Sequence, residues 1–345
     1  MADTVPVVTA VLFRHPSSLE HETGAHPERA ARIVAIEREL ELRGGCGFVA
    51  RESPAATEPQ LEAVHPPAHV ARIRSLARAG GGRIDADTIV SAGSWTAALH
   101  AAGGAVAVVD ALLAGDASRA ASLHRPPGHH CETAEPMGFC LLNNVAVAAR
   151  HARDAHGLER VLVLDWDVHH GNGTAEILAG TDQVLFCSIH QHPLYPGTGR
   201  PGERGHGAGA GFTVNLPVPE GSGDADWIGL ASSVVLPIAR DYQPQLVLVS
   251  AGYDAHADDP LAGCEVSDAG FAAMADAVHG LADELDVPLG LVLEGGYDLG
   301  ALARSVAATL ESWTAPAPAR PPEVGASAVV ERAADWLRRH PPLQA

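Results

Sequence analysis

Short apolar runs alternate along the chain with stretches whose apolar residues recur at helical spacing. The apolar runs are rich in valine and leucine and lie at 7–13, 161–168, 183–189, 212–218, 245–252 and 288–296. Such runs are typical of parallel strands covered on both faces. Helical spacing marks the stretches 27–43, 94–115, 141–157, 267–285 and 301–313. The alternation predicts an α/β fold with a single open, mostly parallel sheet flanked by helices on both faces.

This pattern belongs to one domain, which we place at residues 1–313. The proline-rich segment APAPARPP at 315–322 indicates a linker, with bounds at 314–322. Residues 323–345 then form a C-terminal helical tail, in which 329–340 has the spacing of a short amphipathic helix. We find no internal repeat and expect no second domain of useful size.

Composition limits the partners and the compartment. The chain of 345 residues has a formal net charge of −19, which disfavours nucleic acid as a partner and suits a cationic substrate or simple solubility. No run of 18 or more residues is wholly apolar, so we expect no membrane span. Five cysteines without a CxxC pair favour a reducing compartment. We therefore expect a cytoplasmic protein, for which a homo-oligomer is compatible with the sequence.

Polar clusters follow four of the predicted strands. The strand predicted at 120–124 is followed by RPPGHH, and the other clusters lie at 165–170, 253–254 and 295–297. Ligands of open α/β sheets bind at the carboxyl ends of the strands. The sequence therefore predicts a functional site at this edge of the sheet.

The cluster DWDVHH has the residue types of a metal site. A spacing of two places Asp165, Asp167 and His169 on one face if the strand continues. Asp167 and His169 would then hold one metal ion, with Asp254 as the third ligand. Three protein ligands leave a position open for water and substrate, as in catalytic sites. Zn²⁺, Fe²⁺ and Co²⁺ are all compatible with this set, and the alternative is a group of buried polar residues that satisfy one another.

Two further motifs supply groups for acid–base chemistry. The pKa of a histidine lies near neutral, so His129 and His130 are candidates for taking a proton from water. Tyr297 follows two glycines and is a candidate donor to a developing oxyanion. The alternatives are structural hydrogen bonding by the histidines and an ordinary turn tyrosine.

In this order, the motifs RPPGHH, GFCLLNNVAVA, DWDVHHGNG, LYPGTG, AGYDAHADDPLAG and LEGGYD resemble the histone deacetylase family. The family includes bacterial class II-like members, acetylpolyamine amidohydrolases and acetoin-utilisation proteins. The resemblance covers roughly residues 6–313. It implies a zinc hydrolase on the arginase/deacetylase fold, which agrees with the sheet predicted above.

The resemblance also implies which residues act. The zinc ligands would be Asp167, His169 and Asp254, and the paired histidines would be His129 and His130. Behind those histidines would lie Asp165 and Asn172, and the oxyanion tyrosine would be Tyr297. Many family members carry an acid where Asn172 stands. An amide there orients His130 but stabilises its charged form less than a carboxylate would.

Further positions carry over to ions and to substrate. A first structural K⁺ would use Asp165, Ser188 and the carbonyls of Asp167, His169 and Ile189. A second would use carbonyls near Leu178, Thr181, Val184 and Phe212. The walls of an acyl-lysine channel would include Gly138, Phe139 and Tyr195, and its rim would include Leu261. The substrate backbone would be held by Asp87, and Arg32 would lie behind the acetate pocket.

The expected activity is removal of an acyl group, foremost acetyl, from an N-acyl amine by metal-activated water, with acetyl-lysine as the favoured substrate. Small N-acyl amines such as acetylpolyamines are the nearest alternative, although the apolar Leu261 at the rim disfavours a second ammonium. An arginase-type ureohydrolase needs two metals and further acids, which DVHHGN lacks. A catalytically weak acyl-lysine binding module would be expected to lose Tyr297 or the histidine pair, and both are present.

Overall fold

The computed structural model describes residues 10–316 and 327–343, and its centre is a sheet of eight strands. The strands are β1 (Ala10–Arg14), β2 (Val49–Glu52), β5 (Arg119–Ser122), β6 (Val161–Asp165), β7 (Val184–Gln191), β8 (Thr213–Val218), β9 (Leu246–Ala251) and β10 (Leu289–Leu293). Their order across the sheet is β2-β1-β5-β10-β9-β6-β7-β8. Every neighbouring pair is parallel. The predicted parallel α/β sheet is therefore confirmed.

The helices connect these strands. They are α1 (Ala31–Leu42), α2 (Glu58–Glu62), α3 (Pro67–Arg78), α4 (Ser94–Leu113), α5 (Asn144–Asp154), α6 (Asn172–Leu178), α7 (Asp224–Leu230), α8 (Leu236–Tyr242), α9 (Asp268–Leu285), α10 (Leu299–Thr314) and α11 (Ala328–Arg339). A π-helical segment, η4 (Ala231–Val235), joins α7 to α8. Short 3₁₀ segments lie at η1 (Pro16–Leu19), η2 (Gly44–Gly47) and η3 (Gly207–Gly209), and β3 (Gly81–Arg83) and β4 (Ile89–Ser91) form a small antiparallel pair.

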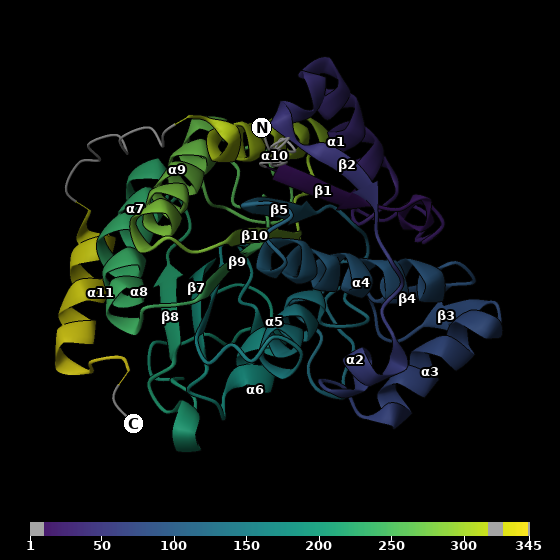
Figure 1. The fold of residues 1–345 in the computed structure, drawn as a ribbon, viewed down its shortest axis with the longest axis horizontal. Coiled ribbons are helices and arrows are strands. Elements are labelled where there is room, and N and C mark those ends of the chain that lie inside the picture. Colours follow the sequence, from purple (N-terminus) through teal and green to yellow (C-terminus); the bar gives the residue numbers. More distant parts are fainter. Residues whose placement is uncertain (1–9, 317–326, 344–345) are drawn as a thin grey trace, which may run out of the picture.

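Helices cover both faces of the sheet (Figure 1). Successive residues of a strand point to opposite faces. In β6, Val161 and Val163 belong to a core cluster with residues of α4 and α5, whereas Leu162 and Leu164 belong to one with residues of α1 and α7 to α10. This burial on both sides explains why the strands are apolar at successive positions.

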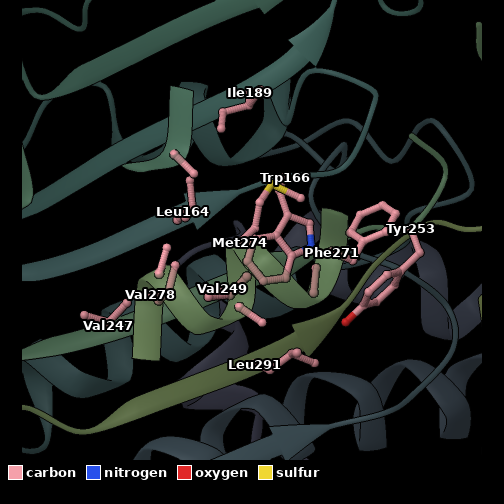
Figure 2. Close-up of a cluster of buried hydrophobic side chains, with 14 of the residues drawn as sticks. Leu164, Trp166, Ile189, Val247, Val249, Tyr253, Phe271, Met274, Val278 and Leu291 are labelled. Carbon is pink, nitrogen blue, oxygen red and sulfur yellow. The ribbon is translucent and has the colours of Figure 1, made fainter. Parts of the chain in front are cut away.

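The core cluster beneath α9 also anchors the carboxyl edge of the sheet (Figure 2). Phe271 and Met274 on α9 are buried against the strands, together with Trp166 and Tyr253. Trp166 follows β6, and Tyr253 lies just beyond β9. Both side chains are 0% exposed. The polar residues that follow them in the chain therefore start from rigid positions.

Helix α4 differs from the expectation that no segment qualifies as a membrane span. By length and composition alone, Ser94–Leu113 is long and apolar enough to cross a membrane, with a mean hydropathy of 1.6. However, 72% of that window is buried inside the fold. Its apolar character is explained by packing, because α4 packs against both the sheet and α5.

Some elements have no clear signal in the sequence. The edge strand β2 is largely exposed and its residues, VARE, show no apolar pattern. In the predicted tail, α11 places Val329, Val330, Ala333 and Leu337 against the main core. The predicted linker at 314–322 overlaps the last residue of α10, and its part from 317 onward lies outside the described residues.

Candidate active site

The predicted polar clusters meet because the strands that they follow are neighbours. β5, β10, β9 and β6 stand side by side in the middle of the sheet and are parallel. Their carboxyl ends therefore face one edge. Residues 125–130, 165–170, 253–254 and 294–297 follow those ends. Of these, Tyr253 points into the core instead of toward the site (Figure 2).

Asp167, His169 and Asp254 form one cluster of potential metal ligands. One ligand atom from each lies within 4.8 Å of the others. His169 Nδ1 is 3.1 Å from Asp167 Oδ1 and 3.1 Å from Asp254 Oδ2. All three residues are buried. The fold thus brings together the three residues that the sequence singles out as metal ligands.

The strand does not continue to His169, so the condition under which one strand face would carry Asp165, Asp167 and His169 is not met. β6 ends at Asp165, and a loop follows. Asp165 Oδ1 accepts the N–H of Asp167 at 3.0 Å, and Asp167 Oδ1 accepts that of His169 at 2.9 Å. Such side-chain bonds to the backbone replace strand pairing. As a result, Asp165 contacts His129, whereas Asp167 and Asp254 face His169.

Glycines leave room for the two ligand carboxylates. A Cβ at Gly295 would overlap the carboxylates of Asp254 and Asp167, and a Cβ at Gly252 would overlap that of Asp167. Asp167 Oδ2 accepts the N–H of Gly295 at 2.8 Å, and Asp254 Oδ1 accepts the N–H of Val168 at 2.9 Å. The backbone therefore holds both carboxylates in place, with Asp167 Oδ1 and Asp254 Oδ2 turned toward His169.

The charges of this cluster favour a cation. Burial raises the pKa of Asp254, and the charge of Asp167 raises it further. Burial would also raise the pKa of Asp167, but the charges of His129 and His169 lower it. Two carboxylates buried this close repel each other unless a positive charge lies between them. Two carboxylates and one imidazole fit Zn²⁺, and they also accept Fe²⁺ or Co²⁺.

His129 and His130 lie side by side in different environments, with ring centroids 4.0 Å apart. Burial alone would lower the pKa of His129, but the carboxylates of Asp167 and Asp165 raise it well above its ordinary value. His129 Nδ1 lies 2.9 Å from Asp165 Oδ2. Burial lowers the pKa of His130, and the charges of His129 and His169 lower it further. His130 is therefore the neutral imidazole of the pair and is able to accept a proton.

Asn172 holds His130 and is itself held by Glu132. His130 Nδ1 donates to Asn172 Oδ1 at 2.8 Å. The amide nitrogen of Asn172 donates to Glu132 Oε1 at 2.8 Å. This second bond fixes which end of the amide faces His130. Glu132 is thus a positioning residue that the sequence analysis did not single out, although it lies two residues after His130.

The amide at position 172 predicts a measurable pH effect. Replacing Asn172 by aspartate should move the acidic limb of the kcat/KM profile to higher pH by roughly 1–3 units, because a carboxylate at this distance stabilises the imidazolium form of His130. In the unaltered protein the pKa of His130 lies below its ordinary value. Activity should therefore be lost only as the pH falls through this lowered pKa. Identical acidic limbs in the two proteins would contradict the role of His130 as the base.

Tyr297 is held from two sides. The Arg32 guanidinium lies 5.0 Å from the centre of the Tyr297 ring, and Arg32 donates to the carbonyls of Gly296 at 2.6 Å and Glu294 at 2.5 Å. Asp259 Oδ2 accepts the N–H of Tyr297 at 2.6 Å. Burial raises the pKa of Tyr297 well above its ordinary value, although Arg32 opposes this. The phenol therefore keeps its proton and is able to donate it in a hydrogen bond.

Two buried acids in the quoted motifs support this site and were missed as positioning residues. Glu294 Oε2 accepts the N–H groups of Gly128 at 2.6 Å and His129 at 3.1 Å, which joins the ends of β5 and β10. Burial raises the pKa of Glu294 to about 7. Asp259 also accepts the N–H of Leu261 at 3.0 Å, and burial raises its pKa to about 7. Both occur within the segments ADDPLAG and LEGGYD, but only their contacts reveal what they do.

The residues assigned to a substrate channel lie around Tyr297 and His130. The rings of Phe139 and Tyr297 are 5.7 Å apart, and those of Tyr195 and His130 are 5.1 Å apart. Gly138 has a φ of +55°, and a Cβ there would overlap the His130 ring. Leu261 is partly exposed. Position 87 lies beside Phe139, because the neighbouring Thr88 Oγ1 accepts the Phe139 N–H at 3.3 Å.

The residues assigned to the two potassium ions lie on β6, β7 and the adjoining loops. Asp165 and Ser188 are paired in register on neighbouring strands, and Ile189 follows Ser188 on β7. In the second set, the carbonyl of Leu178 accepts the N–H of Thr181 at 3.2 Å. The carbonyl of Phe212 accepts a backbone N–H at 2.9 Å, and Val184 begins β7. Both sets therefore have their members close together.

The chain is similar to known proteins over most of its length. Residues 26–313 match the model of the histone deacetylase domain. The chain is 43% identical over 274 residues to "Histone deacetylase-like amidohydrolase" of Pseudomonas aeruginosa, which covers 79% of this chain and 71% of the relative. It is 37% identical over 316 residues to "Histone deacetylase 14, chloroplastic" of Arabidopsis thaliana, and this match covers 86% of this chain and 75% of the relative.

A solved structure has the same fold. The crystal structure of the HDA15 HD domain superposes with a TM-score of 0.89 at 34% sequence identity, and the match covers 96% of this chain and 93% of that one. The likeness extends over the eight-stranded sheet that positions the site. Sequence, fold and domain match therefore agree: this chain belongs to the histone deacetylase family.

Proposed function

We propose that this protein is a zinc-dependent deacylase that removes acetyl groups from lysine side chains. Membership of the family makes hydrolytic deacylation the expected class of reaction. The observation that carries the proposal is the grouping of His129, His130 and Tyr297 around the cluster of Asp167, His169 and Asp254.

The residues of the chain divide the reaction among them. A zinc ion held by Asp167, His169 and Asp254 would supply a Lewis acid for the acyl carbonyl and acidify water. His130 accepts the proton of the attacking water, while His129, whose Nδ1 lies 2.9 Å from Asp165 Oδ2, is placed to hold positive charge beside the negative charge that develops. Tyr297 donates a hydrogen bond to the acyl oxygen. The bond from the acyl carbon to nitrogen breaks, and the amine leaves with a proton while the acyl group leaves as a carboxylate.

An aliphatic, uncharged linker suits the residues assigned to the channel. Phe139 and Tyr195 offer aromatic faces to the methylene chain of an acyl-lysine. Leu261 adds an apolar side chain at the position assigned to the rim. Asp258 lies three residues before Leu261. Its carboxylate is 3.6 Å from the Arg304 guanidinium and is thus already paired. These features favour an acyl-lysine peptide over a substrate with a second ammonium group.

Acetylpolyamine hydrolysis is the second candidate, because two carboxylates, those of Asp85 and Asp87, lie near Phe139. Asp87 and Asp85 share a turn beside Thr88, and Thr88 Oγ1 contacts Phe139. Burial raises the pKa of Asp87, and a hydrogen bond with Asp85 raises it further. A distal ammonium would find a negative partner in this pair.

Release of acetate tests the proposal. Purified protein should release acetate from an acetyl-lysine peptide faster than from acetylspermidine, and a chelator should abolish both reactions until Zn²⁺ is restored. Metal analysis of the active protein, with Fe²⁺ and Co²⁺ as alternatives, identifies the ion. Hydrolysis that survives complete metal removal would contradict zinc dependence, and no release from either substrate would contradict the activity.

The rim predicts a change of specificity. Replacing Leu261 by glutamate should shift kcat/KM toward acetylspermidine and away from a neutral acetyl-lysine peptide. The new carboxylate would attract a distal ammonium and would have to be desolvated by a neutral peptide. Leu261→Met is the matched control, because it keeps an apolar side chain of similar volume. A wild-type protein that already prefers acetylspermidine would contradict the argument from the rim.

We further propose that the two residue sets named above hold structural K⁺ ions, that the chain acts in the cytoplasm and that it engages neither nucleic acid nor membrane as a partner. The net charge of −19 supports the last point, because phosphate backbones and anionic lipids would be repelled.

A further inference from the structure

A second group of potential metal ligands lies on the side of the sheet where the strands begin. Asp110 is in the last turn of α4, His151 is in the last turn of α5, and His156 follows the end of α5 by two residues. α4 leads into the start of β5, and α5 leads into the start of β6. The active-site residues follow the opposite ends of these strands. The length of the sheet therefore separates the two groups.

Both imidazoles converge on one carboxylate oxygen. His151 Nε2 and His156 Nε2 each lie 2.7 Å from Asp110 Oδ1. The two rings are 5.4 Å apart and nearly perpendicular. The chain reverses just after His156, where Gly157 has a φ of +70° and donates its N–H to the carbonyl of Arg153 at 2.9 Å. The bonds from Ala155 to His151 and from Gly157 to Arg153 continue the helical turn past α5 and keep His156 beside its last turn.

We propose that Asp110, His151 and His156 form a second metal site, for a divalent transition ion such as Zn²⁺, Ni²⁺ or Cu²⁺. Imidazole nitrogens suit these ions, whereas Mg²⁺ and Ca²⁺ prefer oxygen ligands only. Three protein ligands leave at least one position for water. The Asp110 side chain is 52% exposed and that of His156 is 28% exposed, so an ion reaches the site directly from solvent.

The surroundings favour positive charge and hold the ligands in place. The C-terminal ends of α4 and α5 both lie here, and the helix dipole places partial negative charge at such ends. The two helices share a core cluster that includes Ala111 of α4 and Ala152 of α5. Small side chains at this contact keep the helix ends close.

An ion at this site would join the ends of two helices that are distant in sequence. Its ligands come together only in the folded chain, so binding stabilises the native state by mass action. Added Zn²⁺ should therefore raise Tm beyond the value of protein that carries one equivalent of zinc. This stabilising role is independent of the proposed catalytic zinc.

Metal stoichiometry tests the proposal on the full chain. After equilibrium dialysis against Zn²⁺, the double variant His151→Ala/His156→Ala and the single variant Asp110→Ala should each bind one equivalent less than wild type, with deacylase activity unchanged. Asp154→Ala and His206→Ala are matched controls that remove a neighbouring acid and an exposed imidazole, and they should bind as wild type does. Because the comparison is a difference between variants, it holds whether or not the catalytic cluster takes zinc.

Electron paramagnetic resonance of added Cu²⁺ separates the two sites. The proposed site offers two imidazole nitrogens, whereas the catalytic cluster offers only that of His169. Wild type that carries one equivalent of zinc should show coupling of added Cu²⁺ to two nitrogens, and the double variant should lose it. If the double variant folds poorly, His156→Ala alone, which lies outside α5, gives the same comparison. Unchanged stoichiometry or an unchanged Cu²⁺ spectrum in a folded variant would overturn the proposal.

Discussion

Replacing Asp254 by alanine should abolish deacylation and leave the chain folded. Asp254 Oδ2 lies 3.1 Å from His169 Nδ1, so the change removes one of only three ligands from the cluster. The core is built from apolar residues on both faces of the sheet and does not depend on this carboxylate. Circular dichroism should therefore stay close to that of wild type while metal content falls, and Tm should fall because the stabilisation that bound metal gives the native state is lost.

Asp258→Ala is the matched control for this experiment. Asp258 lies four residues further along the chain, is exposed and pairs with Arg304 at 3.6 Å. Its removal should leave the hydrolysis of an acetyl-lysine peptide close to the wild-type rate. An Asp254→Ala protein that is fully unfolded would show that the cluster is structural, and one that retains full activity would remove Asp254 from the site.

Replacing Tyr297 by phenylalanine should lower kcat by roughly 10²–10³, the usual cost of losing one oxyanion donor. KM should change little, because the hydrogen bond strengthens only as charge develops on the acyl oxygen. The ring itself should stay in place, since Arg32 lies 5.0 Å from its centre and Phe139 5.7 Å from it. Steady-state kinetics with an acetyl-lysine peptide measure both constants.

Tyr253→Phe is the matched control, because Tyr253 lies at the same edge of the sheet but points into the core (Figure 2). This control should keep kcat close to wild type. A near-wild-type kcat in Tyr297→Phe would exclude Tyr297 from the reaction. A large rise in KM alone would show that its contribution is to substrate binding instead.

Much of the fold is predictable from the sequence because the strands are buried on both faces. The runs at 161–168 and 245–252 contain all of β6 and β9, and the run at 183–189 contains most of β7. Two segments escaped prediction. β2 is a mostly exposed edge strand. α3 buries Val70, Ile73 and Ala77, but it begins at Pro67 within a polar, proline-containing stretch that hides this face. The apolar pattern records burial, so it is weak where burial is slight.

The candidate site divides in a similar way. His129, His130, Asp167 and Tyr297 stand in short motifs whose residue types indicate their chemistry. Glu294, by contrast, sits inside a quoted motif, but its role depends on its contacts with Gly128 and His129, more than 160 positions earlier in the chain. Contacts over such separations leave no local pattern.

Order and residue type along the chain are enough to predict a parallel α/β sheet, its family and a set of metal ligands. They do not determine which strands are neighbours. Along the chain, β6 is the next strand of the eight-stranded sheet after β5, yet β10 and β9 lie between them in the sheet. This arrangement brings Tyr297 and Asp254 to His129 and Asp167. Tertiary packing also ends β6 at Asp165 and draws the ends of α4 and α5 together. The physical reason is that apolar periodicity reports only whether a residue is buried, whereas its partner depends on how distant segments pack.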